Sequence, residues 1–468
     1  MTGATFGIVL NDQSLTAAPA SFAAFSIITG NVIASPNTDA SLFGGAFGAA
    51  APAILRFIAI DCAASACTVA ENKIFILSAI AIGIRISGSA CDVSENTIIS
   101  SREAIGPAGP FAVLIGSVDQ FGFVPIFGGS ITDNALLGTQ HGITCANCND
   151  VIITGNAIEN TALPASFAIS LRKSNHCTIN DNTIESALSA ILLFGGKRNS
   201  IAANQCTAGG SGILLVAEIG PEVSGNRVDR MALPGLAAAL IVERLGISNN
   251  RFTSCGLNMG ALSLALGTYG IFGELHIAGN EVRDTGIVDG KQGPSKRDIG
   301  IFGDLVMEAR ISDNLVTYSD QFNRDPNRED RALLMRGFTE AELRDNLLLG
   351  FAIQIHGNKF VGVGLTALVE LQEARINDRF VVRFERVFFN NNYCSHLTSI
   401  DANQLQATVW LVGRYGIVMS NHIKSFTRRI PAVNYNNMSG PCLGNVLSDN
   451  IINRSLFPPL DADFNMIA

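Results

Sequence analysis

The sequence predicts an all-β solenoid of about 15 coils, each built from three short strands. Three observations predict this class. A six-residue pattern with an Asn between two apolar residues recurs along nearly the whole chain. Its minimum spacing is 22 residues, the distance from Asn182 to Asn204 and from Asn204 to Asn226. A strongly apolar segment precedes each recurrence by about ten residues, and no helical period accompanies the pattern.

The recurring pattern has an apolar residue three positions before the Asn and another two positions after it. Such spacing does not fit one strand, in which inward positions are two residues apart. It fits two strands that meet at a bend. The pattern occurs at Asn31, Asn72, Asn96, Asn134, Asn156, Asn182, Asn204, Asn226, Asn250, Asn280, Asn314, Asn392, Asn421 and Asn450. Asn346 and Asn358 also fit, but they are only 12 residues apart, so the sequence leaves open which one occupies the corner.

We expect the Asn itself to form the bend, because Asn tolerates the left-handed backbone region and hydrogen-bonds locally. Gly or Asp precedes it in most repeats, which is also typical of turns. Stacked from coil to coil, the side-chain amides should form a ladder. The predicted ladder contains Asn156, Asn182, Asn204, Asn226, Asn250, Asn280 and Asn314.

The third strand of each coil is the apolar segment before the bend. Examples are Ala190–Phe194, Gly212–Val216, Ala238–Val242, Ala261–Leu266 and Ile299–Phe302. With these strands and the Asn corners, the chain resembles the right-handed parallel β-helix superfamily, the pectate-lyase-like fold also found in phage tailspikes and bacterial β-helix repeat proteins. The resemblance implies a right-handed, single-stranded parallel β-helix. It implies little about activity, because this fold carries many functions.

We predict one domain over residues 1–468, since each coil of a solenoid contacts only its neighbours. Charged residues make up only 15% of the chain and hydrophobic residues 47%, as parallel sheets around an apolar core require. Four spacings exceed the minimum and predict loops near 34–52, 100–111, 284–297 and 317–331. They leave the solenoid at the same edge, where function usually resides.

The last two loops carry most of the candidate binding residues. They could form a saccharide-binding or catalytic patch, or a solvated surface held by weak ion pairs. No catalytic residue can be assigned from the sequence. The binding candidates are Asp289, Lys291, Arg297, Asp320, Arg324, Arg328 and Asp330.

The ten cysteines predict reduced core thiols and no metal site or cofactor. Cys206 and Cys394 take inward positions where other coils have Ile, Val or Phe, and buried Cys packs as a small hydrophobe. Cys145 and Cys148 with His141 have metal-like spacing but lack a second ligand pair. The start of the chain has no signal-peptide pattern. Reduced thiols suggest synthesis in the cytoplasm, and the abrupt ends suggest a segment of a longer protein or of an assembled extracellular particle.

The strands before the corners are apolar on both faces, which predicts a partner. Ile191–Phe194, Ile213–Val216 and Leu240–Val242 would place an apolar stripe on the outside of the solenoid. We expect other protein subunits, or self-association, to cover it. A formal net charge of −8 without a basic stripe excludes nucleic acid. The apolar runs are too short to span a membrane.

Two function classes follow. The first is a non-catalytic structural or binding module of a larger bacterial or phage-like assembly, such as a fibre, spike, adhesin or injection-particle component, with polysaccharide as a further partner. The second is a polysaccharide lyase, hydrolase or epimerase with its groove beside the loops in 284–331. The missing catalytic constellation favours the first.

Overall fold

The computed structural model of the chain describes residues 6–10, 27–34, 57–77, 81–100, 110–116, 125–160, 166–185, 187–259, 262–288, 291–292, 294, 297–318, 329–337, 352–363, 367–372, 374–376, 380–382, 384–397, 408–425, 433–435 and 446–454. The described residues contain strands and turns but no α-helix. Accordingly, none of them belongs to a helix that could cross a membrane. The chain divides into two compact units, Met1–Glu218 and Ile219–Ala468.

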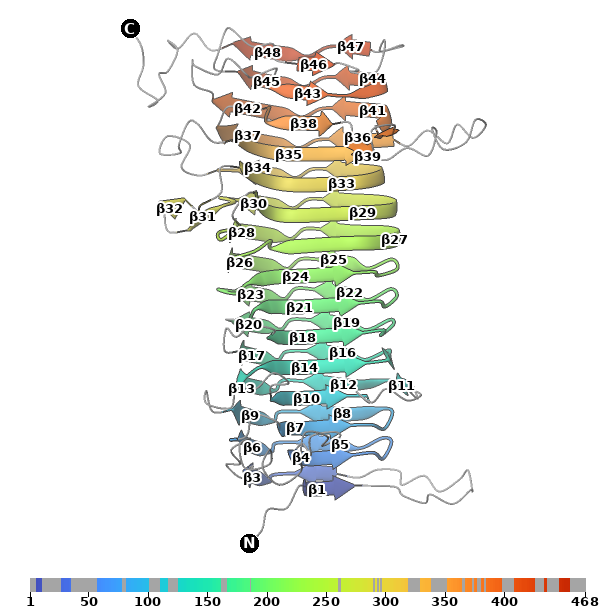
Figure 1. Ribbon diagram of the computed structural model, residues 1–468, viewed down its shortest axis with the longest axis vertical. Coiled ribbons are helices and arrows are strands. Elements are labelled where there is room, and N and C mark those ends of the chain that lie inside the picture. Colours follow the sequence, from blue (N-terminus) through green and yellow to red (C-terminus); the bar gives the residue numbers. More distant parts are fainter. Residues whose placement is uncertain are drawn as a thin grey trace, which may run out of the picture. The chain divides into compact units, whose positions relative to one another are not determined.

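The first unit contains three series of parallel strands, one strand of each series per coil (Figure 1). The corner-entry series precedes each corner Asn: β2 (Ile27–Thr29), β5 (Thr68–Ala70), β8 (Cys91–Ser94), β12 (Gly129–Thr132), β16 (Ile152–Thr154), β19 (Thr178–Asn180) and β22 (Ser200–Ala202). The corner-exit series follows it: β3 (Val32–Ala34), β6 (Lys73–Ile76), β9 (Thr97–Ser100), β13 (Ala135–Thr139), β17 (Ala157–Asn160), β20 (Thr183–Glu185) and β23 (Gln205–Thr207). The apolar series is the third: β1 (Phe6–Leu10), β4 (Phe57–Cys62), β7 (Ala81–Ile86), β10 (Phe111–Ile115), β14 (His141–Ala146), β18 (Phe167–Arg172), β21 (Ser189–Phe194) and β24 (Ser211–Val216). A two-residue pair, β11 (Ile126–Phe127) and β15 (Cys148–Asn149), lies between two of these series.

The second unit repeats the arrangement with longer strands. Its corner-exit series is β26 (Arg227–Met231), β28 (Arg251–Cys255), β30 (Glu281–Arg283), β34 (Leu315–Thr317), β37 (Lys359–Val363), β42 (Tyr393–Leu397), β45 (His422–Ser425) and β48 (Ile451–Arg454). The corner-entry series contains β25 (Glu222–Ser224), β36 (Ala352–His356), β41 (Phe384–Asn390), β44 (Gly413–Met419) and β47 (Val446–Ser448). The apolar series contains β35 (Glu329–Gly337), β38 (Val369–Gln372), β43 (Val409–Leu411) and β46 (Val433–Tyr435). Together the units confirm the predicted all-β class with three parallel series.

Three strands of the second unit correct the prediction of three separate strands in every coil. β27 (Leu236–Ser248), β29 (Ser263–Ala278) and β33 (Arg297–Ser312) each join the apolar and corner-entry series in one continuous strand. The chain still changes direction there, because Leu240, Glu243 and Leu305 have positive φ. Parallel pairing nevertheless continues through the bend of β27 and β29, where Glu243 pairs with Gly273.

The corner differs from prediction in one respect. The left-handed residue is the one before the Asn: φ is +53° at Asp181, +54° at Ala203 and +54° at Asp133. The Asn is therefore not selected for its backbone freedom. It is selected because its side-chain amide makes the hydrogen bonds that hold the turn to its neighbours.

Those hydrogen bonds form the predicted ladder within each unit. In the first unit, the backbone N–H of Asn182 donates to Oδ1 of Asn204 at 3.0 Å, and its Nδ2 donates to the same oxygen at 2.9 Å. Asn156 donates to Asn182 in the same way. In the second unit Asn226, Asn250, Asn280 and Asn314 continue the same pattern. Asn314 then donates to Asn358, which settles the choice left open by the sequence, because Asn346 lies outside the described residues.

The core consists of apolar columns that run from coil to coil. One column of the first unit is fully buried and contains Ile60, Ile84, Val113, Ile143, Ile169, Ile191 and Ile213. Branched side chains stacked in register pack well on neighbouring parallel strands. The inward residues after the corners, Ile184, Cys206 and Val228, are also buried as predicted.

Two of the predicted loops contain ordered strand. Within 284–297, β31 (Ile287–Val288) and β32 (Lys291–Gln292) form a short antiparallel pair. β39 (Ala374–Ile376) and β40 (Phe380–Val382) form a second such pair elsewhere. The predicted loop 317–331 ends earlier than expected, because β35 already begins at Glu329. Most of 34–52 and 100–111 lies outside the described residues.

Candidate functional site

A groove of about 490 Å³ lies on the outer face of the apolar series in the first unit. It crosses four neighbouring strands, β10, β14, β18 and β21, so its walls come from four successive coils (Figure 1). Its volume is within the range of small-ligand sites. The lining residues are Phe111, His141, Thr144, Ala146, Asn147, Phe167, Ser170, Arg172, Lys173, Leu192 and Phe194.

An aromatic stack forms one side of the groove. Phe111, His141 and Phe167 are the first residues of their strands and are direct partners in the parallel register. The rings of Phe111 and His141 lie 4.5 Å apart with an interplanar angle of 23°, and those of His141 and Phe167 lie 5.9 Å apart at 16°. Register fixes this stack, because identical positions on successive coils must lie one above another.

The floor of the groove is polar as well as apolar. Thr144, Ser170 and Leu192 are partners in register and point outward from the core, yet all three are buried. Ser170 is only 1% exposed, and its Oγ has no hydrogen-bond partner in the described structure. A buried hydroxyl without a partner is unfavourable by about 1–3 kcal/mol. A polar group of a ligand that reached Ser170 would remove this cost.

The opposite side of the groove is cationic and apolar. Arg172 ends β18 with its side chain exposed, Lys173 follows it, and Phe194 on the next coil is 47% exposed. Arg172 and Phe194 are partners in register. The eleven lining residues, all in the described part of the chain, include no Asp or Glu. The groove therefore favours an anionic group beside apolar ligand surface.

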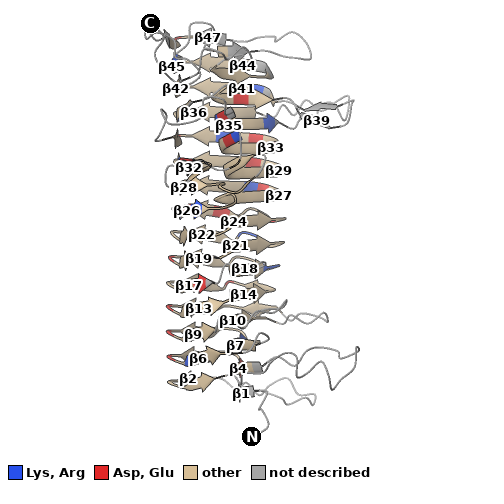
Figure 2. Cartoon of the chain, turned by 60° about the vertical axis from the view of Figure 1, so that its left-hand side comes forward, with Lys and Arg blue, Asp and Glu red and all other residues tan. Residues whose placement is uncertain are grey.

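The predicted binding residues in the two charged loops do not assemble into one surface. Asp289, Asp320, Arg324 and Arg328 lie outside the described residues, as does the side chain of Lys291 in β32. The remaining two, Arg297 and Asp330, lie on neighbouring strands, where positive and negative residues occur together (Figure 2). However, Arg297 is exposed, whereas Asp330 is fully buried.

The charge that follows Asp330 is also satisfied inside the protein. Arg331 forms an ion pair with Glu370 on β38, and both side chains are nearly buried. Its backbone carbonyl accepts a hydrogen bond from the Tyr318 hydroxyl. The described part of these loops thus supports the structural alternative for Asp330 more than a role in binding.

The predicted apolar stripe is partly covered and partly open. Leu192, in the first unit, is buried in the groove floor. In the second unit four large apolar side chains remain exposed by 37–54%. Two pairs of them lie near each other on β27 and β29, where Val242 is the register partner of Phe272. We call Leu240, Val242, Tyr269 and Phe272 the outer apolar patch.

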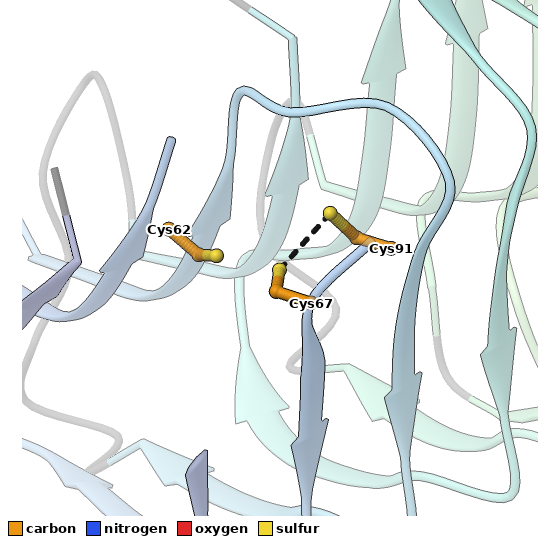
Figure 3. Close-up of side chains that lie close together, drawn as sticks. All are labelled: Cys62, Cys67 and Cys91. Atoms are coloured by element: carbon orange, nitrogen blue, oxygen red, sulfur yellow. Dashed lines mark hydrogen bonds between the residues drawn. The ribbon is translucent and has the colours of Figure 1, made fainter. Parts of the chain in front are cut away.

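A group of three thiols lies at one corner of the first unit (Figure 3). Cys62 ends β4, Cys67 immediately precedes β5, and Cys91 begins β8. All three are buried, and their Sγ atoms lie within 4.8 Å of one another. The Sγ atoms of Cys67 and Cys91 are 3.0 Å apart. We call this group the thiol trio.

The thiols of the trio influence one another's ionisation. The pKa of Cys91 is lowered to about 3, because hydrogen bonds from Cys62 and Cys67, and from backbone N–H groups, favour its thiolate over the opposing effect of burial. Hydrogen bonds from Cys62 and Cys91, with burial, raise the pKa of Cys67. For Cys62, the hydrogen bond with Cys67 lowers the pKa, but the bond with Cys91 and burial outweigh it and raise the pKa to about 11. Cys91 is therefore the first of the three to lose its proton.

Both the groove and the trio were missed by the sequence reasoning, although each left a signal. Phe111, His141 and Phe167 occupy equivalent positions in three coils, 30 and 26 residues apart. Cys67 and Cys91 are 24 residues apart, the same spacing as the corners Asn72 and Asn96. Equal spacing in a solenoid means proximity in space, so aligning the coils on their Asn corners would have shown both groups.

Comparison with known proteins gives one family match. The model of the family described as periplasmic copper-binding protein (NosD) matches residues 65–252 and 124–286. With the three parallel series and the Asn ladder, this match confirms the superfamily. The chain is a right-handed parallel β-helix of the pectate-lyase-like superfamily.

Solved structures similar to this β-helix are distant. One is a variant of DFA-IIIase from Arthrobacter chlorophenolicus A6 bound to DFA-III, with a TM-score of 0.39 and 12% identity over 66% of this chain and 81% of that one. Another is the A-module of the mannuronan C-5 epimerase AlgE4 of Azotobacter vinelandii, with a TM-score of 0.33 and 11% identity over 85% of both chains. The search of curated proteins found no match.

Proposed function

We propose that this β-helix is a non-catalytic binding module whose outer groove holds a segment of an acidic polysaccharide. The observation that carries the proposal is the lining of the groove, which combines an aromatic stack, two cations and a buried Ser170 hydroxyl. Sugars present apolar C–H surface and hydroxyls side by side, which suits this mixture. A carboxylate on the sugar would pair with Arg172 or Lys173.

A purely apolar ligand fits less well. It would fill the space beside Phe111, Phe167 and Leu192 but leave Ser170 Oγ without a partner and the two cations unused. An acidic ligand without apolar surface would meet the cations alone, whose exposed ion pairs contribute little to affinity. A uronate-bearing chain uses both kinds of contact.

Hydrolysis of the bound chain is not supported by the lining. Glycoside hydrolysis generally requires two carboxyl groups flanking the bond, and the described lining contains none. The alternative function, an enzyme acting beside the loops in 284–331, depends on residues that lie mostly outside the described part of the chain. It is therefore treated as an outcome of the test.

The test is calorimetric titration of the chain with oligogalacturonate and with a neutral oligosaccharide of equal length. We expect binding of the acidic ligand only, weakened by added salt because exposed charges are screened. Phe167→Ala and Arg172→Gln should each weaken binding by about tenfold or more, in line with loss of a charged hydrogen bond or a stacked ring. Lys73→Gln on β6, an exposed cation of the corner-exit series, is the matched control and should have no effect.

Three results would overturn the proposal. Equal affinity for the neutral ligand would remove the role of the cations. Binding that is unchanged in both groove variants would place the site elsewhere. Shortened or unsaturated products appearing during incubation would show that the chain is an enzyme and would restore the alternative.

A further inference from the structure

The thiol trio has the geometry of a metal site. Three ligands from three different strands converge on one point of the core, and the longest distance between their sulfurs is within 4.8 Å. Metal–thiolate bonds are about 2.3 Å long, so three sulfurs around one ion in a plane are about 4 Å apart. The trio therefore needs shifts of under about 1 Å to surround an ion.

The backbone holds these sulfurs in place without help from the thiols. The turns before Cys67 and Cys91 have the same left-handed residue, with φ of +54° at both Ala66 and Ala90. The two turns are stacked by hydrogen bonds, from Ala66 N to Ser89 O at 2.8 Å and from Asp92 N to Cys67 O at 2.8 Å. Such a rigid frame would keep the ligands together before an ion arrives, which favours binding.

The trio is not a simple continuation of a core column. In the coils after Cys62, the register partners are Ile86 and Ile115, which fill the same inward position with larger side chains. After Cys91 the partner is Gly129. Only at this corner do the described residues bring three thiols within ligand distance of one another.

The set of donors indicates which class of ion would fit. All three side chains are thiols, the softest ligands that proteins offer, and soft ligands select ions such as Cu(I). Zn²⁺ in a structural site takes four ligands in a tetrahedron. The group contains no fourth side chain, and the nearest oxygen to Cys91 Sγ with a recorded contact is the backbone carbonyl of Ala64, at 3.2 Å.

We propose that Cys62, Cys67 and Cys91 form a three-coordinate binding site for one soft monovalent metal ion of the Cu(I) class. The ion would replace the thiol protons, which are released to solvent, and no electron is transferred. The site is independent of the groove, because its sulfurs face the core whereas the groove lies on the outer surface.

The test uses the full chain, reduced and kept free of oxygen, in competition with a chromophoric Cu(I) chelator. We expect the protein to withdraw one equivalent of Cu(I). X-ray absorption of the complex should report three sulfur neighbours. Cys62→Ala, Cys67→Ala and Cys91→Ala should each lower the affinity by more than about tenfold, beyond the usual loss when an outer-shell partner is removed.

Cys206→Ala is the matched control, since Cys206 is equally buried but lies in another strand series, on β23. It should bind Cu(I) like the unchanged protein. Four results would overturn the proposal: no withdrawal of Cu(I), unchanged affinity in the trio variants, an equal loss in Cys206→Ala, or tighter binding of Zn²⁺ than of Cu(I). If a trio variant fails to fold, the sulfur count from the unchanged protein decides, and fewer than three sulfurs would refute the site.

Discussion

The Asn ladder should be a main source of stability at the corners, and Asn182→Leu tests this directly. Asn182 is 1% exposed. Its Oδ1 accepts hydrogen bonds from the backbone N and the Nδ2 of Asn156, at 3.0 and 2.9 Å. Its Nδ2 donates to the carbonyls of Ile153 and Asn180, at 3.0 and 2.9 Å. Leucine has a similar size but offers none of these bonds.

The expected cost follows from the groups that lose their partner. The substitution removes the side-chain partner of three backbone groups: the N–H of Asn156 and the carbonyls of Ile153 and Asn180. At about 1 kcal/mol for each buried group, the lower end of the usual range, the free energy of unfolding should fall by about 3 kcal/mol. The matched control is Asn180→Ala, because the Asn180 side chain bonds only to Asp181 at the surface. A surface change of this kind should cost less than about 0.5 kcal/mol.

Urea denaturation followed by circular dichroism measures the two variants side by side. Hydrogen exchange adds a local readout, since the amide of Asn156 should exchange faster in Asn182→Leu and not in Asn180→Ala. If both variants unfold at the urea concentration of the unchanged protein, or if both lose stability equally, the side-chain ladder does not stabilise the corners.

Three further outcomes are expected. Burial lowers the pKa of His396 from 6.5 to about 4, so stability should be complete above pH 6.5 and fall by about 3 kcal/mol as the pH drops toward 4; His396→Leu should remove this slope in urea titrations, and an unchanged slope would exclude His396 as its source. Burial raises the pKa of Cys177 and of Cys206 to about 12, so a thiol reagent at pH 7 should label neither until denaturant is added, and mass spectrometry showing labelling of the folded chain, or a disulfide at either residue, would contradict this. We also expect self-association through the outer apolar patch, so light scattering should report an oligomer that Phe272→Ser dissociates, whereas a monomer at all concentrations would leave the patch without this role.

Most of the fold could be predicted from the sequence, because one residue type marks every coil. The Asn corners set the number of coils and the inward positions, and the structure confirms both within each unit. The backbone conformation of the corner was wrong, since the pattern shows that Asn is needed but not which of its properties is used. The long strands such as β29 were also missed, because a bend at Gly270 that keeps its hydrogen-bonded register leaves no turn signal.

The candidate site was harder to predict, because the repeat hides what varies. Charged residues in loops such as Arg297 and Asp330 attract attention in a sequence, but the structure buries one of them and exposes the other. The groove residues are individually ordinary: a Phe, a His and a Ser in strands. Only their register across coils makes them a site, and register follows from the corner spacing rather than from local residue type.

The floor of the groove also constrains how a ligand must lie. Its residues form one outward column, which begins with the ion pair of Asp61 and Arg85 and continues through Thr144 and Ser170 to Leu192. The column is buried although it faces away from the core, because the aromatic stack on one side and the side chains around Arg172 on the other stand above it. The four strands of the groove span three intervals between coils, about 14 Å. A ligand on this floor therefore crosses the strands and runs from coil to coil, which an extended polymer can do and a compact molecule cannot.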